Sequence, residues 1–457
     1  MIRNVIFSSM LAATLAACGD GGTSNAQPDA AATPDTPNGG QVVRVNDNIT
    51  TDTTWKAENV YVIPRLKQLF VEPGATLTLE PGTVVQGEQG AVLVITRGAK
   101  IMAEGTKDKP IVLTTSQPAG QKTAGWWGGL LVLGNAPINT NVLSSPSSTE
   151  ATFEAFTSAI PEGKFGGTDA HDNSGVIKYV RIEFAGFNFV ADREFNNLTL
   201  CGVGDATTVD FVQVHGGSDD GVEFFGGTVN VKHMVSSQNQ DDGFDTDNGW
   251  SGKAQFVIVQ NISHPATLPE ATNGYESDNH GTAASYNALP RTSPTVYNVT
   301  LIGDHAYTGV ASYAAVFRRG TSGHYFNHIW FNFPKGPEFR DAETQAQLDS
   351  GALEIRSSMF FNNDASAANM PAPQATGDIV ESNYIDVTHN DQINVDPGLV
   401  ADVMSKTAPN FMPAPSSSAL GGGATPPDDG FFDPSATFIG AIGTVDWTQG
   451  WTAYPQN

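Results

Sequence analysis

Basic residues and long apolar runs are scarce in this chain. It has 23 Lys and Arg against 48 Asp and Glu, which gives a net charge of −25 at pH 7. Such a surface repels nucleic acid and anionic lipid, which excludes a nucleic-acid partner, and it attracts cations. Beyond residue 40 no apolar run is long enough to span a bilayer. Strong helix formers are also uncommon, whereas Gly (48 residues), Thr, Val and Asn abound, and this composition favours an all-β fold.

The N-terminus carries the one notable apolar run, and it predicts export. Arg3 precedes an apolar stretch over residues 5–17 that is too short for a transmembrane helix in the mature protein. The stretch ends in LAAC (residues 15–18), which resembles the bacterial lipobox, in which the cysteine is acylated and becomes the first mature residue. The pattern predicts a signal peptide over residues 1–17 and lipidation of Cys18, rather than an ordinary secretory signal with an incidental cysteine. Gly19, in place of Asp, favours sorting to the outer membrane.

Residues 18–40 are predicted to form a lipidated, disordered tether. They contain no aromatic residue and are rich in Pro, Ala, Asp and Gly, a composition that cannot bury enough apolar surface to order itself. Because the acyl chains would hold the protein on a membrane, the predicted location is the outer membrane. The body would be displayed at some distance from the lipid, on the surface or the periplasmic face.

Self-similar segments recur along the rest of the chain. Residues 73–77 are echoed 24 residues later by 97–101, and both segments alternate apolar and polar side chains as half-buried strands do. A second series of strand-like segments runs through the middle, with the apolar anchors Val212, Met234 and Val257 spaced 22 and 23 residues apart. Looser copies follow at residues 297–301, 326–330 and 356–360. Repeats of this length are typical of solenoids.

The period of 22–24 residues predicts a single-stranded, right-handed parallel β-helix. One coil of such a helix needs about that many residues, and longer intervals indicate loops inserted at the corners. A sandwich has antiparallel strands and no constant single-coil period, and a propeller repeats at about 40–50 residues. We expect the β-helix to cover residues 41–430, with residues 42–65 as its N-terminal cap. We expect the aromatic-rich residues 431–457 to cap the last coil, because an open solenoid end templates aggregation.

Several longer motifs resemble those of a widespread family of exported β-helix proteins of Gram-negative bacteria. These motifs are GWWGGL (125–130), GNAPIN (134–139), DNSG (172–175), YVRI (179–182), DDGVEFFGG (219–227) and the closing DW and GWT at 446–447 and 450–452. The family includes leptospiral outer-membrane lipoproteins. The resemblance runs from about residue 42 to the end and implies a pectin-lyase-like β-helix at the cell surface. It does not imply a catalytic activity.

The densest polar cluster is a stacked set of acidic residues. The segment DDGVE (219–223) aligns with DDGFD (241–245) at the offset of 22, and GYESD (274–278) is a third copy after an inserted loop. If Val222, Phe244 and Tyr275 face the core, the alternation of a strand directs the following residues outward. The expected cluster consists of Asp219, Asp220, Glu223, Asp241, Asp242, Asp245, Asp247, Glu276 and Asp278.

Carboxylates this close together need compensation by protons, basic neighbours or a cation. Because hard oxygen ligands at this density suit Ca²⁺, one hypothesis is a calcium site formed by these residues. The alternative is that the carboxylates are solvated or paired with Lys232, Lys253, Arg318 and Arg319. The spacing matches no EF-hand, and the calcium-binding RTX nonapeptide is absent.

Two functions of different classes remain open. The first is a non-catalytic surface lipoprotein whose flank binds a glycan, a matrix component or a partner outer-membrane protein. The second is a Ca²⁺-dependent polysaccharide lyase or glycoside hydrolase, with Asp219, Asp220, Asp241 and Asp242 as acids and Lys253, Arg318 or His233 as base. The polygalacturonase-type series of motifs is not present in order, and fold analogy alone does not establish an activity. A non-catalytic role is therefore favoured.

Three further features of the sequence bear on the fold. Cys201 has no partner for an internal disulfide if Cys18 is acylated, and we interpret it as a buried apolar residue. Trp126 and Trp127 beside two glycines are interpreted as core filling at a corner, with a sugar-stacking platform as the alternative. Residues 139–172 lack a regular pattern and predict a long excursion from one coil.

The lipobox interpretation predicts the behaviour of one variant. Cys18→Ala removes the acylated thiol, so lipid labelling should be abolished and the protein should leave the membrane fraction. Metabolic labelling with a radioactive fatty acid, followed by fractionation, measures both. Continued acylation of the variant would refute the prediction.

Overall fold

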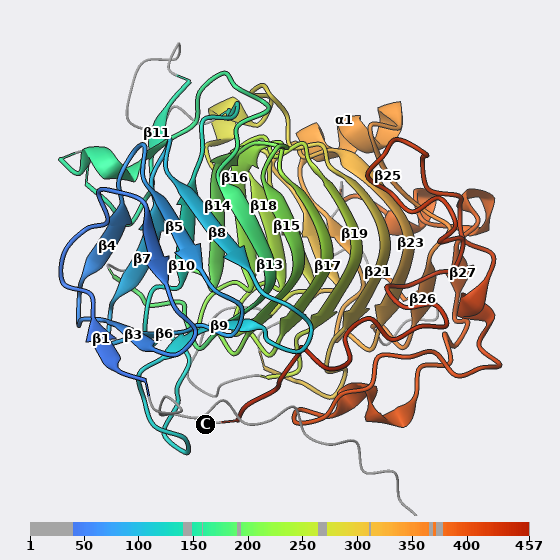
Figure 1. Ribbon diagram of the computed structural model, residues 1–457. Helices are drawn as coiled ribbons and strands as arrows, with labels where there is room; N and C mark the ends of the chain where they lie inside the picture. Colours follow the sequence, from blue (N-terminus) through green and yellow to red (C-terminus); the bar gives the residue numbers. More distant parts are fainter. Residues whose placement is uncertain are drawn as a thin grey trace, which may run out of the picture.

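The computed structural model describes residues 40–139, 149–157, 159–189, 193–263, 272–309, 312–364, 369–371 and 378–456. The predicted signal peptide, Cys18 with its predicted acylation and nearly all of the predicted tether lie outside these residues. The described chain winds into a rod of stacked strands that runs from the N-terminal to the C-terminal coils (Figure 1). Among the described residues, no helix is long and apolar enough to cross a membrane.

One wall of the rod, here called sheet B, is a parallel sheet with one strand from each successive coil. Its strands are β4 (Gln68–Val71), β7 (Val92–Ile95), β10 (Leu130–Leu133), β14 (Leu198–Val203), β16 (Val222–Gly227), β18 (Phe244–Asp247), β20 (Tyr275–Ser277), β22 (Ala315–Phe317) and β24 (Glu338–Phe339).

The other walls are formed by sheet A, which is also parallel. Its main path contains β1 (Val42–Arg44), β3 (Val60–Ile63), β6 (Val84–Gly87), β9 (Ile111–Thr115), β13 (Gly175–Glu183), β15 (Thr208–His215), β17 (Asn230–Ser237), β19 (Lys253–Gln260), β21 (Thr295–Ile302), β23 (Gly323–Phe331), β26 (Met359–Phe361) and β27 (Gln392–Ile393). Beside it lie β2 (Thr53–Trp55), β5 (Thr76–Leu79), β8 (Lys100–Glu104) and β25 (Leu353–Arg356), and the short α1 (Ala342–Ser350) precedes β25.

The predicted parallel β-helix is confirmed, including its register. Val212 pairs with Met234 and Met234 with Val257 in parallel strands of consecutive coils. These anchors are fully buried, because alternate side chains of each strand point into the rod and stack on their equivalents above and below. The repeat in the sequence is therefore the repeat of the coil.

Sheet A turns a sharp corner at a residue in the left-handed conformation. In β13 the part before Tyr179 pairs with β8 and the part after it pairs with β9. Tyr179, Phe211, His233 and Phe256 occupy this corner in four successive coils, with φ between 49° and 61°. A left-handed conformation costs a residue with a side chain roughly 1–2 kcal/mol. Stacking of the four rings, with centroids 4.2–5.0 Å apart, offsets part of this cost.

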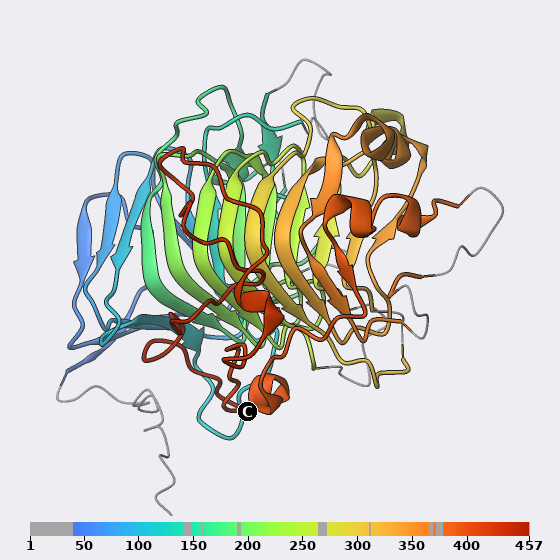
Figure 2. The ribbon, with the colours of Figure 1, turned by 90° about the vertical axis from the view of Figure 1, so that its right-hand side faces the viewer.

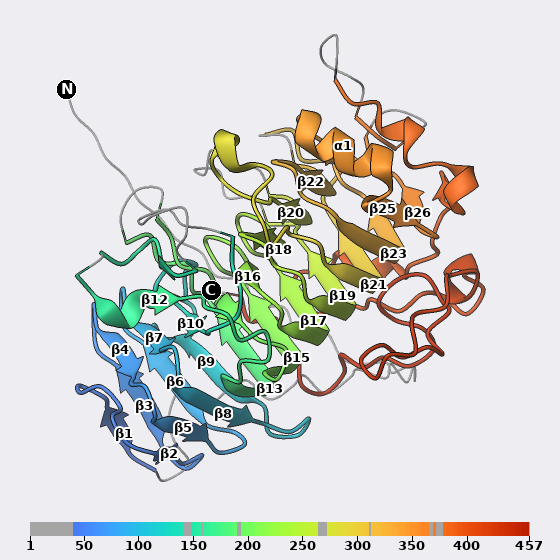
Figure 3. The same ribbon diagram turned by 90° about the horizontal axis from the view of Figure 1, so that it is seen from above.

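The predicted excursion between β10 and β13 folds over the N-terminal half of the outer face of sheet B. It contains the antiparallel pair β11 (Ala151–Thr152) and β12 (Lys164–Phe165), which lies near β7 and β10 (Figure 3). Phe153 and Phe156 pack on an apolar outer surface that includes Cys201 and Phe225. Cys201 is fully buried, as expected, and burial raises the pKa of its thiol.

The tryptophan pair fills the core at a corner. Trp127 is fully buried in the main hydrophobic cluster, and its Nε1 donates to the carbonyl of Glu183 over 2.9 Å. Trp126 is half-buried and packs against the same cluster. The interpretation as core filling is confirmed for Trp127, which leaves no platform of two exposed indoles.

Both predicted caps are placed differently by the structure. Residues 42–65 contain β1, β2 and β3, and β1 already stacks in parallel on β3 of the next coil, so these residues belong to the first coils of the β-helix rather than to a separate cap. The strands end at Ile393, well before residue 430. Residues 408–456, here called the strap, turn back along the outer face of sheet A (Figure 2). Trp447 and Trp451 lie against Phe211 in the middle of the rod and not over the last coil, because the aromatic corner stack supplies an apolar surface there.

Inward and outward positions should differ in their contribution to stability. Leu200 in β14 is fully buried, so Leu200→Ala should lower the free energy of unfolding by about 2–5 kcal/mol through the cavity it leaves. Thr208 in β15 is exposed, and Thr208→Ala should change it by less than about 0.5 kcal/mol. Urea denaturation of both variants measures the difference, and equal losses would contradict the assigned alternation.

Candidate functional site: a carboxylate row on sheet B

The register of sheet B aligns acidic side chains from three consecutive coils. Glu223 in β16 pairs with Asp245 in β18, and Asp245 pairs with Glu276 in β20. Their neighbours Val222, Phe244 and Tyr275 are buried in the core, so the three carboxylates point outward, as predicted. The next outward positions add Asp247 at the end of β18 and Asp278 just after β20, and the main-chain N–H of Asp278 donates to the carbonyl of Thr246 over 2.8 Å.

The carboxylate row begins where the apolar part of the outer face of sheet B, which the excursion covers, ends. On the outer face, Cys201 pairs with Phe225 and Phe225 with Asp247. Cys201 and Phe225 lie under the excursion, and Asp247 is the first charged side chain in this column. The change from apolar to acidic within one column of the sheet places the row beside the excursion.

The corner before each strand adds two acidic pairs, Asp219-Asp220 and Asp241-Asp242. Asp220 Oδ1 accepts the main-chain N–H of Asp242 over 2.9 Å, and Asp242 Oδ1 accepts that of Asn273 over 3.2 Å. In the next coil Asn273 Oδ1 accepts the N–H of Tyr313 over 2.8 Å. Because an asparagine makes the same bond one coil later, the hydrogen-bond ladder does not require the negative charges of Asp220 and Asp242.

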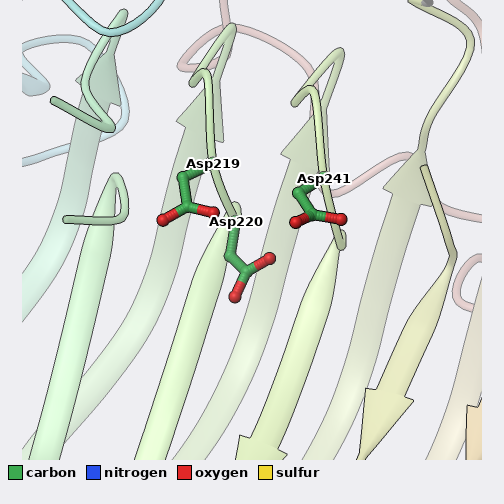
Figure 4. Close-up of side chains that lie close together, drawn as sticks. All are labelled: Asp219, Asp220 and Asp241. Atoms are coloured by element: carbon green, nitrogen blue, oxygen red, sulfur yellow. The ribbon is translucent and has the colours of Figure 1, made fainter. Parts of the chain in front are cut away.

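Three overlapping groups of carboxylates have the size of a cation site. Within each group, one oxygen from each of the three residues lies within 4.8 Å of the others, and the groups are Asp219, Asp220 and Asp241; Asp220, Glu223 and Asp245; and Asp242, Asp245 and Glu276. Oxygen ligands at 2.3–2.6 Å from Ca²⁺ are separated by at most about twice that length. The first group gathers at the corner from two neighbouring coils (Figure 4).

Burial and mutual repulsion disfavour the charged form of these groups. Burial, followed by the neighbouring acids, raises the pKa of Asp220, Glu223 and Asp245 well above the ordinary range. Burial raises the pKa of Asp242 to about 6 and that of Asp247 to about 7. The buried Oδ1 of Asp245 has no hydrogen-bond partner among the described residues. The surroundings therefore favour bound protons, or a cation in their place, over several adjacent negative charges.

Arginines neutralise the C-terminal end of the row. Arg318, just after β22, pairs with Glu276 and, over 2.9 Å, with Asp278, and Arg319 reaches Asp278 over 2.5 Å. The salt-bridge alternative is therefore confirmed for these two acids. Burial also raises the pKa of Glu276, and Arg318 opposes that shift.

The other basic candidates are not at the row. Lys253 pairs with Asp429 of the strap, and Lys232 donates to the carbonyl of Phe431, both on the outer side of sheet A. His233 stacks between Phe211 and Phe256 in the aromatic corner, where its Nδ1 contacts Asp210 over 2.8 Å. The expected pairing of Lys232 and Lys253 with the carboxylates is wrong, because both lie on strands of the other sheet. His233, named as a candidate base, lies on that sheet as well.

Asn196, Glu154 and Glu194 lie near the carboxylate row and were not predicted from the sequence. Asn196 Nδ2 donates to Glu223 Oε2 over 2.6 Å. Burial, followed by Glu194, raises the pKa of Glu154 to about 7, and Glu154 in turn raises the pKa of Glu223. Glu154 belongs to the excursion, which has no counterpart in other coils, so no repeat in the sequence indicates its position.

Fold and site together define a parallel β-helix with a carboxylate row on one outer wall. A family model described as a pectate-lyase like beta helix domain matches residues 47–408. This match covers most of the chain, which therefore belongs to that family. No match was found among curated proteins or among solved structures. Membership fits a binding or polysaccharide-related role and leaves the specific function open.

The hydrogen-bond ladder at the corner predicts that two substitutions at Asp220 have different effects on stability. In metal-free buffer Asp220→Ala should lower the free energy of unfolding by about 1–3 kcal/mol, because the N–H of Asp242 loses its acceptor. Asp220→Asn keeps an acceptor and cannot ionise beside the neighbouring acids, so it should be as stable as the wild type or more stable. Urea denaturation at pH 8 in EDTA measures the stability of both variants. Asn273→Ala, which removes the equivalent acceptor one coil later, is the matched control. Equal destabilisation by Asn and Ala would show that the charge itself supports the fold.

Proposed function

We propose that the protein is a lipid-anchored β-helix of the outer membrane that binds Ca²⁺ in the carboxylate row. Its acidic flank would then bind an extracellular glycan or a partner outer-membrane protein without catalysis. The proposal rests on the three sets of carboxylates whose oxygens lie close enough together to bind one cation. The hydrogen-bond ladder at the corner does not require the negative charges of Asp220 and Asp242. Membrane attachment rests on the lipobox at Cys18.

The chemistry of the donors favours Ca²⁺ among common cations. All the donors are carboxylate oxygens, which suit hard cations. Mg²⁺ demands near-ideal octahedral geometry and retains its waters, whereas Ca²⁺ tolerates irregular sets of six to eight oxygens. Carboxylates from successive coils, supplemented by water, form such an irregular set.

The corner group is the preferred position for the ion. Glu276, in the third group, already pairs with Arg318, so an ion there competes with a guanidinium. Asp219, Asp220 and Asp241 stand at the opposite end of the row, two to three coils away from that arginine's strand. An ion at this corner would join two coils and neutralise the acids that the arginines do not pair with.

A polysaccharide lyase or hydrolase is the second candidate. Asp242 and Asp247, with pKa values of about 6 and 7, would suit proton transfer near neutral pH. Of the predicted bases, however, Lys253 and His233 lie on sheet A, and Arg318 is held by two carboxylates. This arrangement favours binding over catalysis.

Calcium should stabilise the wild type. A ligand that binds only the folded state adds RT ln(1 + [L]/Kd), about 2.7 kcal/mol at a hundred times Kd. The wild type should melt at a higher temperature in millimolar Ca²⁺ than in EDTA, and Asp241→Asn combined with Asp245→Asn should remove this difference. Differential scanning calorimetry measures both, and identical wild-type curves in Ca²⁺ and EDTA would end the metal hypothesis.

The effect of calcium should also depend on pH. Because the folded state raises the pKa of these carboxyls, it binds protons more tightly than the unfolded state does, and metal-free stability contributed by them falls as pH rises from about 4 towards 8. Ca²⁺ must displace those protons, so the calcium-dependent rise in Tm should be larger at pH 8 than at pH 5. A rise that is independent of pH would place the ion at carboxylates of ordinary pKa.

A glycan array separates the two candidate functions. The soluble body is applied with Ca²⁺ and with EDTA, and the glycans that retain it are then incubated with it in solution. Calcium-dependent retention of intact glycans supports the binding role. Shortened or unsaturated products, detected by mass spectrometry and by absorbance of the unsaturated sugar, would instead establish the enzyme.

A further inference from the structure

The outer face of sheet A holds the strap through its main chain. Three buried amide side chains each bond to both the N–H and the C=O of a single strap residue. Gln213 binds Ala453 through bonds of 2.7 and 2.9 Å, and Asn327 binds Ala424 through bonds of 2.8 and 2.7 Å. The third clamp is Gln255 on Asp433, with bonds of 3.3 and 2.7 Å.

Further polar groups on the same face donate to strap carbonyls. Asn298 Nδ2 donates to Ala436 over 3.1 Å and to Phe438 over 2.7 Å. His215 Nε2 donates to Pro455 over 2.9 Å. Gln213, Gln255, Asn298 and Asn327 are fully buried beneath the strap, so any strap segment that failed to satisfy these amides there would lose free energy of binding.

Two apolar anchors fix the position of the strap. Trp447 and Trp451 meet the aromatic corner stack edge-on, with ring centroids 5.2 Å from His233 and 5.8 Å from Tyr179 respectively. Elsewhere the clamps contact main-chain atoms, which every residue except proline offers equally. Recognition therefore combines main-chain clamps with aromatic contacts, which also include Phe432 on Tyr297 and Phe438 on Phe256.

We propose that this face is a peptide-binding site for a polypeptide segment with the sequence of the strap. The chain's own strap occupies it, and the site accepts the same segment when it is supplied in trans, including from a second copy of the protein. The strap begins where the match to the β-helix family ends, at residue 408, so it lies beyond the family domain. This proposal is independent of the calcium site.

The test uses the full chain, cut once. A site-specific protease sequence is inserted between Thr407 and Ala408, which are both exposed, and the cut protein is passed over a sizing column. The fragment from residue 408 onward should remain bound, with an unchanged circular dichroism spectrum. An excess of a fluorescent synthetic peptide of the same sequence should then replace it.

Matched peptides test how the segment is recognised. N-methylation of the main chain at Ala424, Asp433 and Ala453 removes the clamped N–H groups and should weaken competition at least ~10-fold, the loss of about one main-chain bond pair. Ala424→Ser, Asp433→Asn and Ala453→Ser alter only side chains and should compete within about twofold.

Four outcomes would overturn the proposal. They are loss of the fragment from the cut protein under native conditions, loss of the β spectrum on cutting, no exchange with the parent peptide, and equal weakening by the side-chain and N-methyl peptides. The last outcome would show that the site recognises side chains, and the other three that it does not act as a separable binding site.

Discussion

Parallel stacking of coils in register is the constraint on which the rest of this structure depends. Each side chain lies one strand spacing, about 4.8 Å, from its equivalent in the next coil, so like residues meet. Val212, Met234 and Val257 form a continuous core in this way. The same geometry stacks Tyr179 on Phe211 at a strained corner, passes a hydrogen bond from Asp220 to Asp242 and on to Asn273, and brings Glu223, Asp245 and Glu276 together.

For apolar and amide side chains this stacking is favourable, but for carboxylates it requires compensation. Among the described residues, Arg318 and Arg319 pair with Glu276 and Asp278 at one end of the row. Towards the excursion the compensation changes, and burial and repulsion raise the pKa values of Asp220, Glu223 and Asp245 so that protons are retained. A bound cation would perform the same role without protons, which is why the acidic end and not the arginine end is the proposed site. The opposite wall of the rod uses stacked amides to hold a peptide segment, so the two outer faces have different binding chemistry.

The sequence alone predicted what the repeat controls. The 22-residue offset was sufficient for the parallel register, for the inward positions of Val222 and Phe244, and for the alignment of Glu223 with Asp245. It could not predict what lies outside the repeat. The strap has no period, and its seat depends on side chains such as Gln213 and Asn327 that are distant from it in sequence. For the same reason the sequence placed Trp447 and Trp451 over the last coil, offered Lys253 as a partner of the carboxylates, and gave no indication of Glu154.

The claim that the corner of Asp219, Asp220 and Asp241 is a cation site is tested most directly by locating an ion. Tb³⁺ has the oxygen-ligand preference of Ca²⁺ and a strong anomalous signal, so crystals grown with Tb³⁺ can be examined in an anomalous difference map. We expect the highest peak to lie among these three carboxylates, and added Ca²⁺ should diminish it. A map with no peak at this corner, or with peaks only at other acidic surfaces, would contradict the claim.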